Sequence, residues 1–189
     1  MKLTPTAYVI LGMVSREARS GYEIKAAVDD STRFFWAASY GQIYPELKRL
    51  SEAGLVEGTD SPTGGRKRIV YTITADGEEE LRAWLRQPPE VFEMRDEGLL
   101  KLFFADALPR EEAVQILRSM RERREAVNQQ LRALKQMKGE LEPTKDEAKG
   151  AYTLVVLRCG IEYTDWFVDW CRRVEEQILA AADRDQRRS

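Results

Sequence analysis

Residues 39–56 read Ser-Tyr-Gly-Gln-Ile-Tyr-Pro-Glu-Leu-Lys-Arg-Leu-Ser-Glu-Ala-Gly-Leu-Val, and this stretch decides the predicted fold. Ile43, Leu47 and Leu50 are spaced by four and then three residues, so on a helix they form one apolar face. The Ser-x-x-Gln pattern at the beginning matches a capping box, and Gly54 is typical of a helix end. We therefore predict a helix over most of this stretch, packed through a single face.

The other face of this predicted helix carries phenol, amide and ammonium groups. Such groups suit phosphate and base-edge contacts in the major groove of DNA. A solvated helix surface without a ligand fits the spacing alone equally well, so the neighbouring segments must decide between the two. The predicted DNA contacts on this helix are Ser39, Tyr40, Gly41, Gln42, Tyr44 and Lys48.

The segments on either side predict a winged helix-turn-helix. Upstream, Thr4 followed by proline begins one helix, and residues 20–23 form a second capping box at the start of another. Downstream, residues 55–57 and the alternating segment 66–73 predict a β-hairpin, and Thr74 caps a fourth helix. The order helix, helix, helix, strand, strand, helix is that of a helix-turn-helix with a β-hairpin wing.

The predicted wing is basic where it follows its turn. Residues 64–65 are both glycine, and Arg66, Lys67 and Arg68 come directly after them. Three consecutive cations beside a turn can contact phosphates or enter a minor groove. A lone basic triplet is usually solvated surface, but this one follows a helix with exposed tyrosines and lysine at winged-helix spacing. We therefore add the three cations to the predicted DNA contacts.

With these segments, the chain resembles the PadR family of bacterial transcriptional regulators. The motifs that carry the resemblance are Gly21–Ile24, Phe34–Trp36, Gly41–Leu50, Gly54–Val56, Gly65–Arg68 and Tyr71–Gly77, with Gly160–Tyr163 and Trp170 as weaker landmarks of the longer, virulence-regulator-like tail. The resemblance implies a homodimeric repressor, often released from DNA by a small ligand. Two winged helices related by a two-fold axis would bind a palindromic operator in duplex DNA.

The second half of the chain is expected to consist of long helices. Two prolines follow Gln87, and a proline pair ends a helix, so we predict a DNA-binding domain over residues 1–87 and a helical dimerisation and effector domain over 88–189. A long helix opens at Pro109. Its apolar seam, with one arginine, is Ala113, Leu117, Met120, Arg124, Val127, Leu131 and Leu134.

A last helix is predicted from Lys145 to about Ala182. Two long helices cannot bury all the apolar surface of this half on each other, which favours a second copy of the chain. Aromatic side chains could also stack on a small aromatic or lipophilic effector, or they could simply form a helix or dimer core. The residues in question are Phe34, Phe35, Trp36, Tyr163, Trp166 and Trp170.

Composition excludes several classes of protein. The 189 residues include no histidine, which removes histidine-based triads and metal sites. Cys159 and Cys171 are 12 residues apart, about 18 Å on one helix, too far for a disulfide, and are interpreted as small core hydrophobes. No signal peptide or membrane span is predicted, so a cytoplasmic location is expected.

The sequence thus predicts a mainly α protein with a small β-hairpin, and a non-enzymatic regulator without cofactor or metal. No nucleophile and base pair, nucleotide-binding loop or metal cluster is recognisable. The formal net charge of −2 means that DNA binding must come from a local basic surface. The alternative is a winged-helix module that binds another protein and has no specific affinity for DNA.

Overall fold

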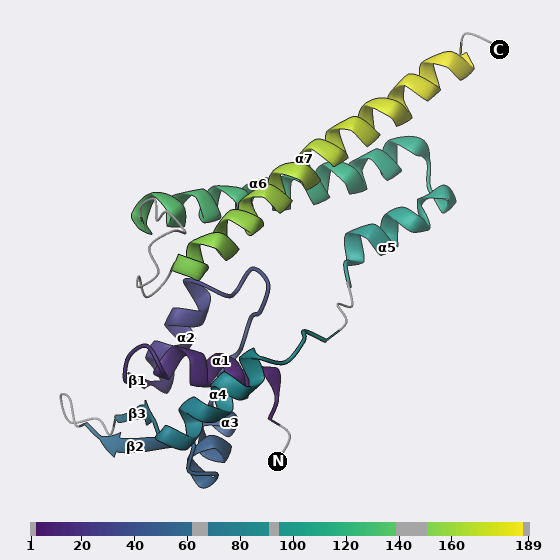
Figure 1. Cartoon of the computed structure of the whole chain (residues 1–189). Helices are drawn as coiled ribbons and strands as arrows, with labels where there is room; N and C mark the ends of the chain where they lie inside the picture. Colours follow the sequence, from purple (N-terminus) through teal and green to yellow (C-terminus); the bar gives the residue numbers. More distant parts are fainter. Residues whose placement is uncertain (1–2, 62–67, 91–94, 139–150, 187–189) are drawn as a thin grey trace. The chain divides into compact units, whose positions relative to one another are not determined.

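The computed structural model describes residues 3–61, 68–90, 95–138 and 151–186. The chain divides into two compact units, Met1–Val91 and Phe92–Ser189. Each unit has a hydrophobic core of its own. The fold is mostly helical with a small antiparallel sheet, as predicted (Figure 1).

The first unit is a winged helix-turn-helix. Its elements are α1 (Pro5–Val14), β1 (Arg19–Ser20), α2 (Gly21–Asp29), α3 (Tyr40–Glu52), β2 (Val56–Asp60), β3 (Ile69–Ile73) and α4 (Ala75–Leu85). The predicted hairpin is confirmed as β2 and β3, which pair antiparallel from Val56 opposite Ile73 to Asp60 opposite Ile69. β1 was not predicted; it pairs with β3 on the other side and gives the order β1-β3-β2.

The predicted helix starts are confirmed by their capping contacts. The Thr4 hydroxyl accepts a hydrogen bond from the amide of Ala7 at 3.2 Å. The Thr74 hydroxyl does the same for the amide of Gly77 at 3.1 Å. At the start of α2, Glu23 and Ser20 form the reciprocal capping box. Each cap satisfies a backbone donor that the first helical turn leaves unpaired.

The core of the first unit holds α3 by the face that its sequence predicts. Ile43, Leu47 and Leu50 are completely buried among apolar side chains of α1 and α2. A second contact fixes the same helix: the Glu46 carboxylate accepts hydrogen bonds from the Thr4 hydroxyl at 2.9 Å and from Arg49 at 3.1 Å. These contacts anchor α3 to α1 and leave its remaining face in solvent.

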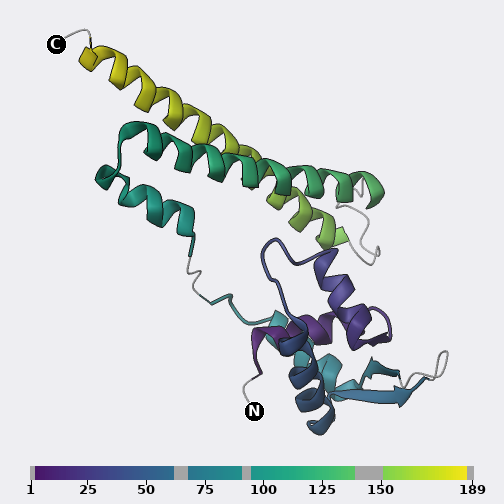
Figure 2. The ribbon, with the colours of Figure 1, turned by 180° about the vertical axis from the view of Figure 1, so that it is seen from behind.

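The second unit is built on two long helices. It contains α5 (Glu97–Phe103), the short 3-10 helix η1 (Ala105–Ala107), α6 (Arg110–Lys138) and α7 (Ala151–Gln186). α6 and α7 lie side by side in both views (Figures 1 and 2). They run antiparallel, because Arg118 pairs with Glu175 while Arg132 pairs with Asp165.

The predicted seam of α6 lies within the chain itself. Leu117, Met120 and Leu131 are buried, and the first two pack with Phe167 and Cys171 of α7. The predicted start of the last helix, at Lys145, lies outside the described residues. Its predicted end near Ala182 falls short of the observed one, since α7 continues to Gln186.

The arginine that interrupts the seam has a specific environment. The Arg124 guanidinium donates a 2.8 Å hydrogen bond to Asp96, just before α5. It also lies 4.7 Å from the ring centroid of Phe167 and 5.5 Å from that of Tyr163. A guanidinium over an aromatic face is attracted to the ring quadrupole. The arginine therefore connects α6 to both α5 and α7.

The two cysteines differ in exposure. Cys171 is buried, and burial raises the pKa of its thiol. Cys159 is exposed, so its interpretation as a core residue is wrong for this chain taken alone. Both thiols are free, as the predicted helical separation requires. Among the described residues, no helix is long and apolar enough to cross a membrane, and no acidic or cysteine cluster could hold a metal ion.

Candidate nucleic-acid interface

The solvent face of α3 presents every residue that the sequence predicts for it. All six side chains or backbone positions are exposed: Ser39, Tyr40, Gly41, Gln42, Tyr44 and Lys48. Two of them are tyrosines, whose rings can stack and whose hydroxyls can donate hydrogen bonds. The structure thus exposes the predicted contacts of this helix at its cap and along its first three turns.

Two of these polar side chains already have partners within the helix. The Gln42 side-chain oxygen accepts hydrogen bonds from the Ser39 amide at 2.9 Å and from the Ser39 hydroxyl at 3.1 Å. That capping role uses the side-chain oxygen of Gln42, so a predicted DNA contact by Gln42 would have to come from its amide nitrogen. The Lys48 ammonium lies 3.8 Å from Glu52, and both side chains are highly exposed. Exposed pairs of this kind are weak, so a phosphate can displace the glutamate.

A tyrosine of α2 joins this surface, and sequence reasoning did not include it. The Tyr22 ring stacks on Tyr40 with centroids 6.4 Å apart, and Tyr40 stacks on Tyr44 at 6.2 Å. The signal that could have found it is the helix-turn-helix arrangement itself, which packs the start of α2 against the start of α3. We call Tyr22, Tyr40 and Tyr44 the tyrosine stack.

Gly21 makes room for one end of the tyrosine stack. A Cβ atom at this position would lie 2.7 Å from Cε1 of the Tyr44 ring, closer than such atoms approach in proteins. The Tyr44 ring therefore rests directly on the backbone of the first turn of α2. Glycine at this place allows a close approach of two helices, and the approach sets where the Tyr44 phenol points.

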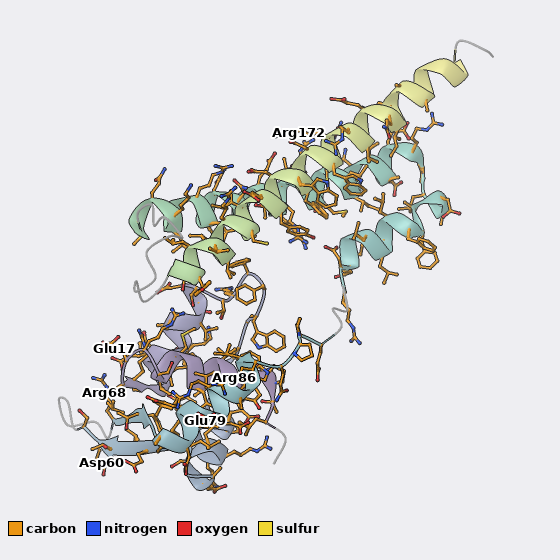
Figure 3. All side chains as sticks on the ribbon, viewed as in Figure 1. Glu17, Asp60, Arg68, Glu79, Arg86 and Arg172 are labelled. Atoms are coloured by element: carbon orange, nitrogen blue, oxygen red, sulfur yellow. The ribbon has the colours of Figure 1, made fainter. Side chains whose placement is uncertain are left out.

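The wing is closed at its base by a backbone hydrogen bond from Ser61 to Arg68 at 2.7 Å. Arg66 and Lys67 lie outside the described residues. The Arg68 guanidinium donates a 2.6 Å hydrogen bond to the Glu23 carboxylate; Figure 3 labels Arg68 at the wing. Any phosphate contact by Arg68 would therefore share its guanidinium with Glu23.

Glu23 is the centre of a small polar network. Its carboxylate also accepts hydrogen bonds from the Ser20 amide and hydroxyl, both at 2.8 Å. The backbone and hydroxyl hydrogen bonds from Ser20, followed by the one from Arg68, lower the pKa of Glu23 to about 2. The carboxylate is thus ionised at neutral pH, and its charge sits at the first turn of α2.

The proposed effector residues fall into two sets, one in each unit. Between α2 and α3, Phe34 is half-buried and packs edge-to-face with the exposed Phe35, while Trp36 is also exposed. On α7, Tyr163 and Trp166 are exposed and Trp170 is half-buried. Phe167 is the buried aromatic of this helix, and sequence reasoning did not single it out. That the two sets form one ligand site stays a prediction.

The second unit also has a polar surface hollow of about 530 Å³ between α6 and α7. Its polar side chains pair with each other: Arg172 with Glu125 at 2.8 Å, and the Asn128 amide with the Asp165 carboxylate at 2.8 Å. Arg172 is labelled on α7 in Figure 3. These contacts join the two helices, which indicates a structural role for the hollow.

Comparison with known proteins decides the family. Residues 10–83 match the Transcriptional regulator PadR-like family, and residues 94–178 match the family described as Virulence activator alpha C-term. Over 181 residues the chain is 31% identical to the negative transcriptional regulator PadR of Bacillus subtilis (strain 168), covering 94% of this chain and 97% of that protein. The chain belongs to the PadR-like family of transcriptional regulators.

Solved structures of Bacillus subtilis PadR are similar to this PadR-like chain over almost its whole length. The crystal structure of that protein in complex with operator DNA has a TM-score of 0.81 and 29% identity, covering 91% of this chain and 98% of the other. The crystal structure with p-coumaric acid has a TM-score of 0.74 and 28% identity, covering 94% and 98%. The predicted PadR resemblance and winged-helix fold are confirmed, and the family is one of regulators, not enzymes.

Proposed function

We propose that this PadR-like protein is a homodimeric repressor that binds palindromic sites in duplex DNA. The observation that carries the proposal is the division of α3 into two faces. Ile43, Leu47 and Leu50 fix the helix in the core, while the opposite face presents Tyr44 and Lys48 to solvent. A helix held in this way can enter a major groove without disturbing the fold. The relative of known structure with operator DNA supports the same function.

The homodimer is supported by the outer face of α7. With the α6 seam already buried inside the chain, apolar and aromatic side chains of α7 remain in solvent, among them Val156, Tyr163 and Trp166. Their steps of seven and three residues keep them on one side of the helix. A two-fold axis through such a face would pair two copies and present two α3 helices to successive major grooves.

A small aromatic effector is the second part of the proposal. Bacillus subtilis PadR has been crystallised with p-coumaric acid, and this chain offers stacking groups in Phe34–Trp36 and in Tyr163, Trp166 and Trp170. A ligand weakens DNA binding only if it binds better to a dimer whose α3 helices are misplaced for the operator. A coupling free energy of about 1–3 kcal/mol gives a 5- to 150-fold change in affinity.

Selection of bound fragments from fragmented genomic DNA, followed by sequencing, tests the proposal. We expect a palindromic site with half-sites one or two helical turns apart, about 10–10.5 bp per turn. Affinity for that site should fall steeply with salt. Weak, salt-insensitive association with no common sequence would instead indicate a winged helix that binds protein.

We also propose a cytoplasmic location, because a bacterial repressor acts on the chromosome, which lies in the cytoplasm.

Titration with p-coumaric acid and related aromatic compounds tests the effector. Tryptophan fluorescence reports binding, since Trp36, Trp166 and Trp170 belong to the proposed residues. The same titration with bound operator reports release. A compound that changes the fluorescence and leaves operator affinity unchanged is a bystander, and it would contradict the proposed release.

A further inference from the structure

The tyrosine stack spans two helices and is open to solvent along its length. Tyr22 of α2 is 67% exposed, and Tyr40 and Tyr44 of α3 are 44% and 51% exposed. The rings of each neighbouring pair are close to parallel, with interplanar angles of 17° for Tyr22–Tyr40 and 22° for Tyr40–Tyr44. The surface that α3 presents to DNA therefore continues without a break onto α2.

The stack is held in place from behind. The Lys25 ammonium lies 5.6 Å from the ring centroid of Tyr40 and is itself paired with Asp29. The Lys25 side chain is only 17% exposed, so it packs behind the middle ring of the stack. At one end of the stack, the Gly21 backbone supports the Tyr44 ring. Rings that already have packing partners lose less conformational entropy when they bind a ligand.

The position of Tyr22 suits a contact with the sugar-phosphate backbone. When the second helix of a helix-turn-helix lies in the major groove, the first helix crosses the backbone beside it. Tyr22 lies in the first turn of that first helix and is in contact with Tyr40 at the start of the second. Tyrosine hydroxyls are common donors to phosphate oxygens in protein–DNA complexes.

The backbone amides at the start of α2 are poorly suited to the same phosphate. A helix N-terminus normally attracts anions through its free amides. Here Glu23 occupies that end: its carboxylate accepts a hydrogen bond from the Ser20 amide and carries a negative charge at neutral pH. A phosphate at this place would be repelled by the Glu23 carboxylate. The neutral phenol of Tyr22 is therefore the better partner for the phosphate.

We infer that Tyr22 donates its phenolic hydrogen to a phosphate of the operator, so that the DNA interface extends from α3 onto α2 through the tyrosine stack. This inference rests on the proposed DNA binding. It assigns Tyr22 a contact with the backbone, which is the same for all base sequences. Removing the hydroxyl should therefore weaken binding to specific and non-specific DNA by the same factor.

The test uses the full-length protein and the DNA fragment that the wild-type protein selects. Tyr22→Phe removes the hydroxyl and keeps the stacked ring. Tyr8→Phe is the matched control, because its hydroxyl is directed to Glu80 of α4 at 2.8 Å. We expect Tyr22→Phe to weaken binding about two- to tenfold, the range of one net hydrogen bond, with Tyr8→Phe unchanged once circular dichroism shows both folded.

Salt dependence separates this contact from a charged one. A neutral phenol displaces no counterion, so the slope of log affinity against log salt should be the same for Tyr22→Phe and wild type. Lys48→Ala, in contrast, should reduce that slope by about 0.9 if its ammonium neutralises one phosphate of B-DNA. A reduced slope in Tyr22→Phe would contradict the inferred neutral contact.

Methylphosphonate substitution along the operator locates the contact. At one position in each half-site the substitution should weaken the wild type more than Tyr22→Phe, by the factor that the Tyr22→Phe change itself costs, because both proteins lose the phosphate charge and only the wild type loses the hydrogen bond. If Tyr22→Phe binds the unmodified operator as tightly as wild type does, the inference is wrong. It is also wrong if the methylphosphonate weakens Tyr22→Phe and wild type by the same factor at every position. A wild-type protein that selects no DNA would overturn the proposed function itself, which is a different result.

Discussion

The Glu23 carboxylate of α2 accepts a 2.6 Å hydrogen bond from the Arg68 guanidinium, 45 residues later in the chain. The same carboxylate caps α2 through the Ser20 amide. One side chain therefore both begins the first helix of the helix-turn-helix and holds the base of the wing. The placement of the wing relative to α2 depends on the ionisation of Glu23, which leads to the first prediction.

Acid should destabilise the first unit partly through Glu23. Its folded-state pKa of about 2 is below the ordinary value of 4.5, so the carboxylate stabilises the fold above about pH 4.5 and loses that contribution as the pH falls from 4.5 toward 2. Glu23→Gln should lower the free energy of unfolding at pH 7 more than at pH 3. Urea unfolding at both pH values measures this. Glu52→Gln, on the exposed face of α3, is the control; equal losses for Glu23→Gln at both pH values would contradict the prediction.

The wing cations should bind DNA without regard to sequence. Replacing Arg66, Lys67 and Arg68 together by alanine should weaken binding to all fragments, because contacts with phosphates carry no base information. The slope of log affinity against log salt should become shallower by about 0.9 for each phosphate that the variant no longer neutralises. Arg86→Ala, at the C-cap of α4, where the arginine pairs with Glu79, controls for the removal of a cation. An unchanged slope in the folded triple variant would remove the wing from the interface.

Gly21→Ala should weaken operator binding with a small effect on stability. The new methyl group would meet the Tyr44 ring, the far end of a side chain that can swing aside, and would lie 3.3 Å from Cδ1 of Leu47, which has to shift by only a few tenths of an ångström. The fold should tolerate the change, and the displaced phenol should no longer reach the DNA. Fluorescence anisotropy with labelled operator measures affinity, and thermal unfolding measures stability. Gly12→Ala, with open space around its Cβ position, should bind as wild type does; normal binding by Gly21→Ala would show that the position of Tyr44 is unimportant.

Gly77→Ala, in contrast to Gly21→Ala, should have a large effect on stability. A Cβ at residue 77 would lie 2.1 Å from the backbone oxygen of Leu55, which cannot rotate away. Forcing an atom into such a contact costs about 1–3 kcal/mol or more, so the free energy of unfolding should fall by that amount. Chemical denaturation measures it. Gly12→Ala again serves as the control and should be neutral or stabilising by up to about 1 kcal/mol, since alanine favours helix.

Dimerisation should depend on the exposed face of α7. Light scattering at micromolar concentration should give about twice the chain mass of 21.8 kDa. Trp166→Glu, which places a charge on a residue that is 54% exposed in the single chain, should shift the mass toward the monomer. Gln136→Glu, an exposed change on α6, should not. A monomeric wild type, or a fully dimeric Trp166→Glu, would exclude this face as the interface.

The parts of the fold that were predictable are those written in short stretches of sequence. The capping boxes at Ser20 and Ser39 and the periodicity of Ile43, Leu47 and Leu50 each lie within a dozen residues. Local patterns of this length determine where helices begin and which face they bury. β1 was not predicted, because two residues are too few to show a strand pattern. Its pairing with β3 exists only in the folded chain.

The parts of the site that were missed depend on contacts between distant segments. Tyr22 looks like an ordinary surface residue until α2 packs against α3 and the ring meets Tyr40. Arg68 was predicted as a phosphate ligand because its charge is visible in the sequence, whereas its hydrogen bond to Glu23 is not. The aromatic residues of α7 are visible in the sequence. Which of them is buried depends on where α6 packs, and only the structure shows that this residue is Phe167.

The environment of Arg124 has a consequence for how α6 and α7 are aligned. A seam made only of apolar side chains could slip by one helical turn, about 5.4 Å, and each apolar group would simply meet another. In the observed alignment the Arg124 guanidinium contacts Asp96 and the faces of Phe167 and Tyr163 together. After a slip it would keep Asp96, which is not on α7, and would lose both ring faces. A polar residue in a seam commonly selects one alignment in this manner. By excluding the slipped arrangements, Arg124 also determines where along α6 the exposed Trp166 ring of α7 lies.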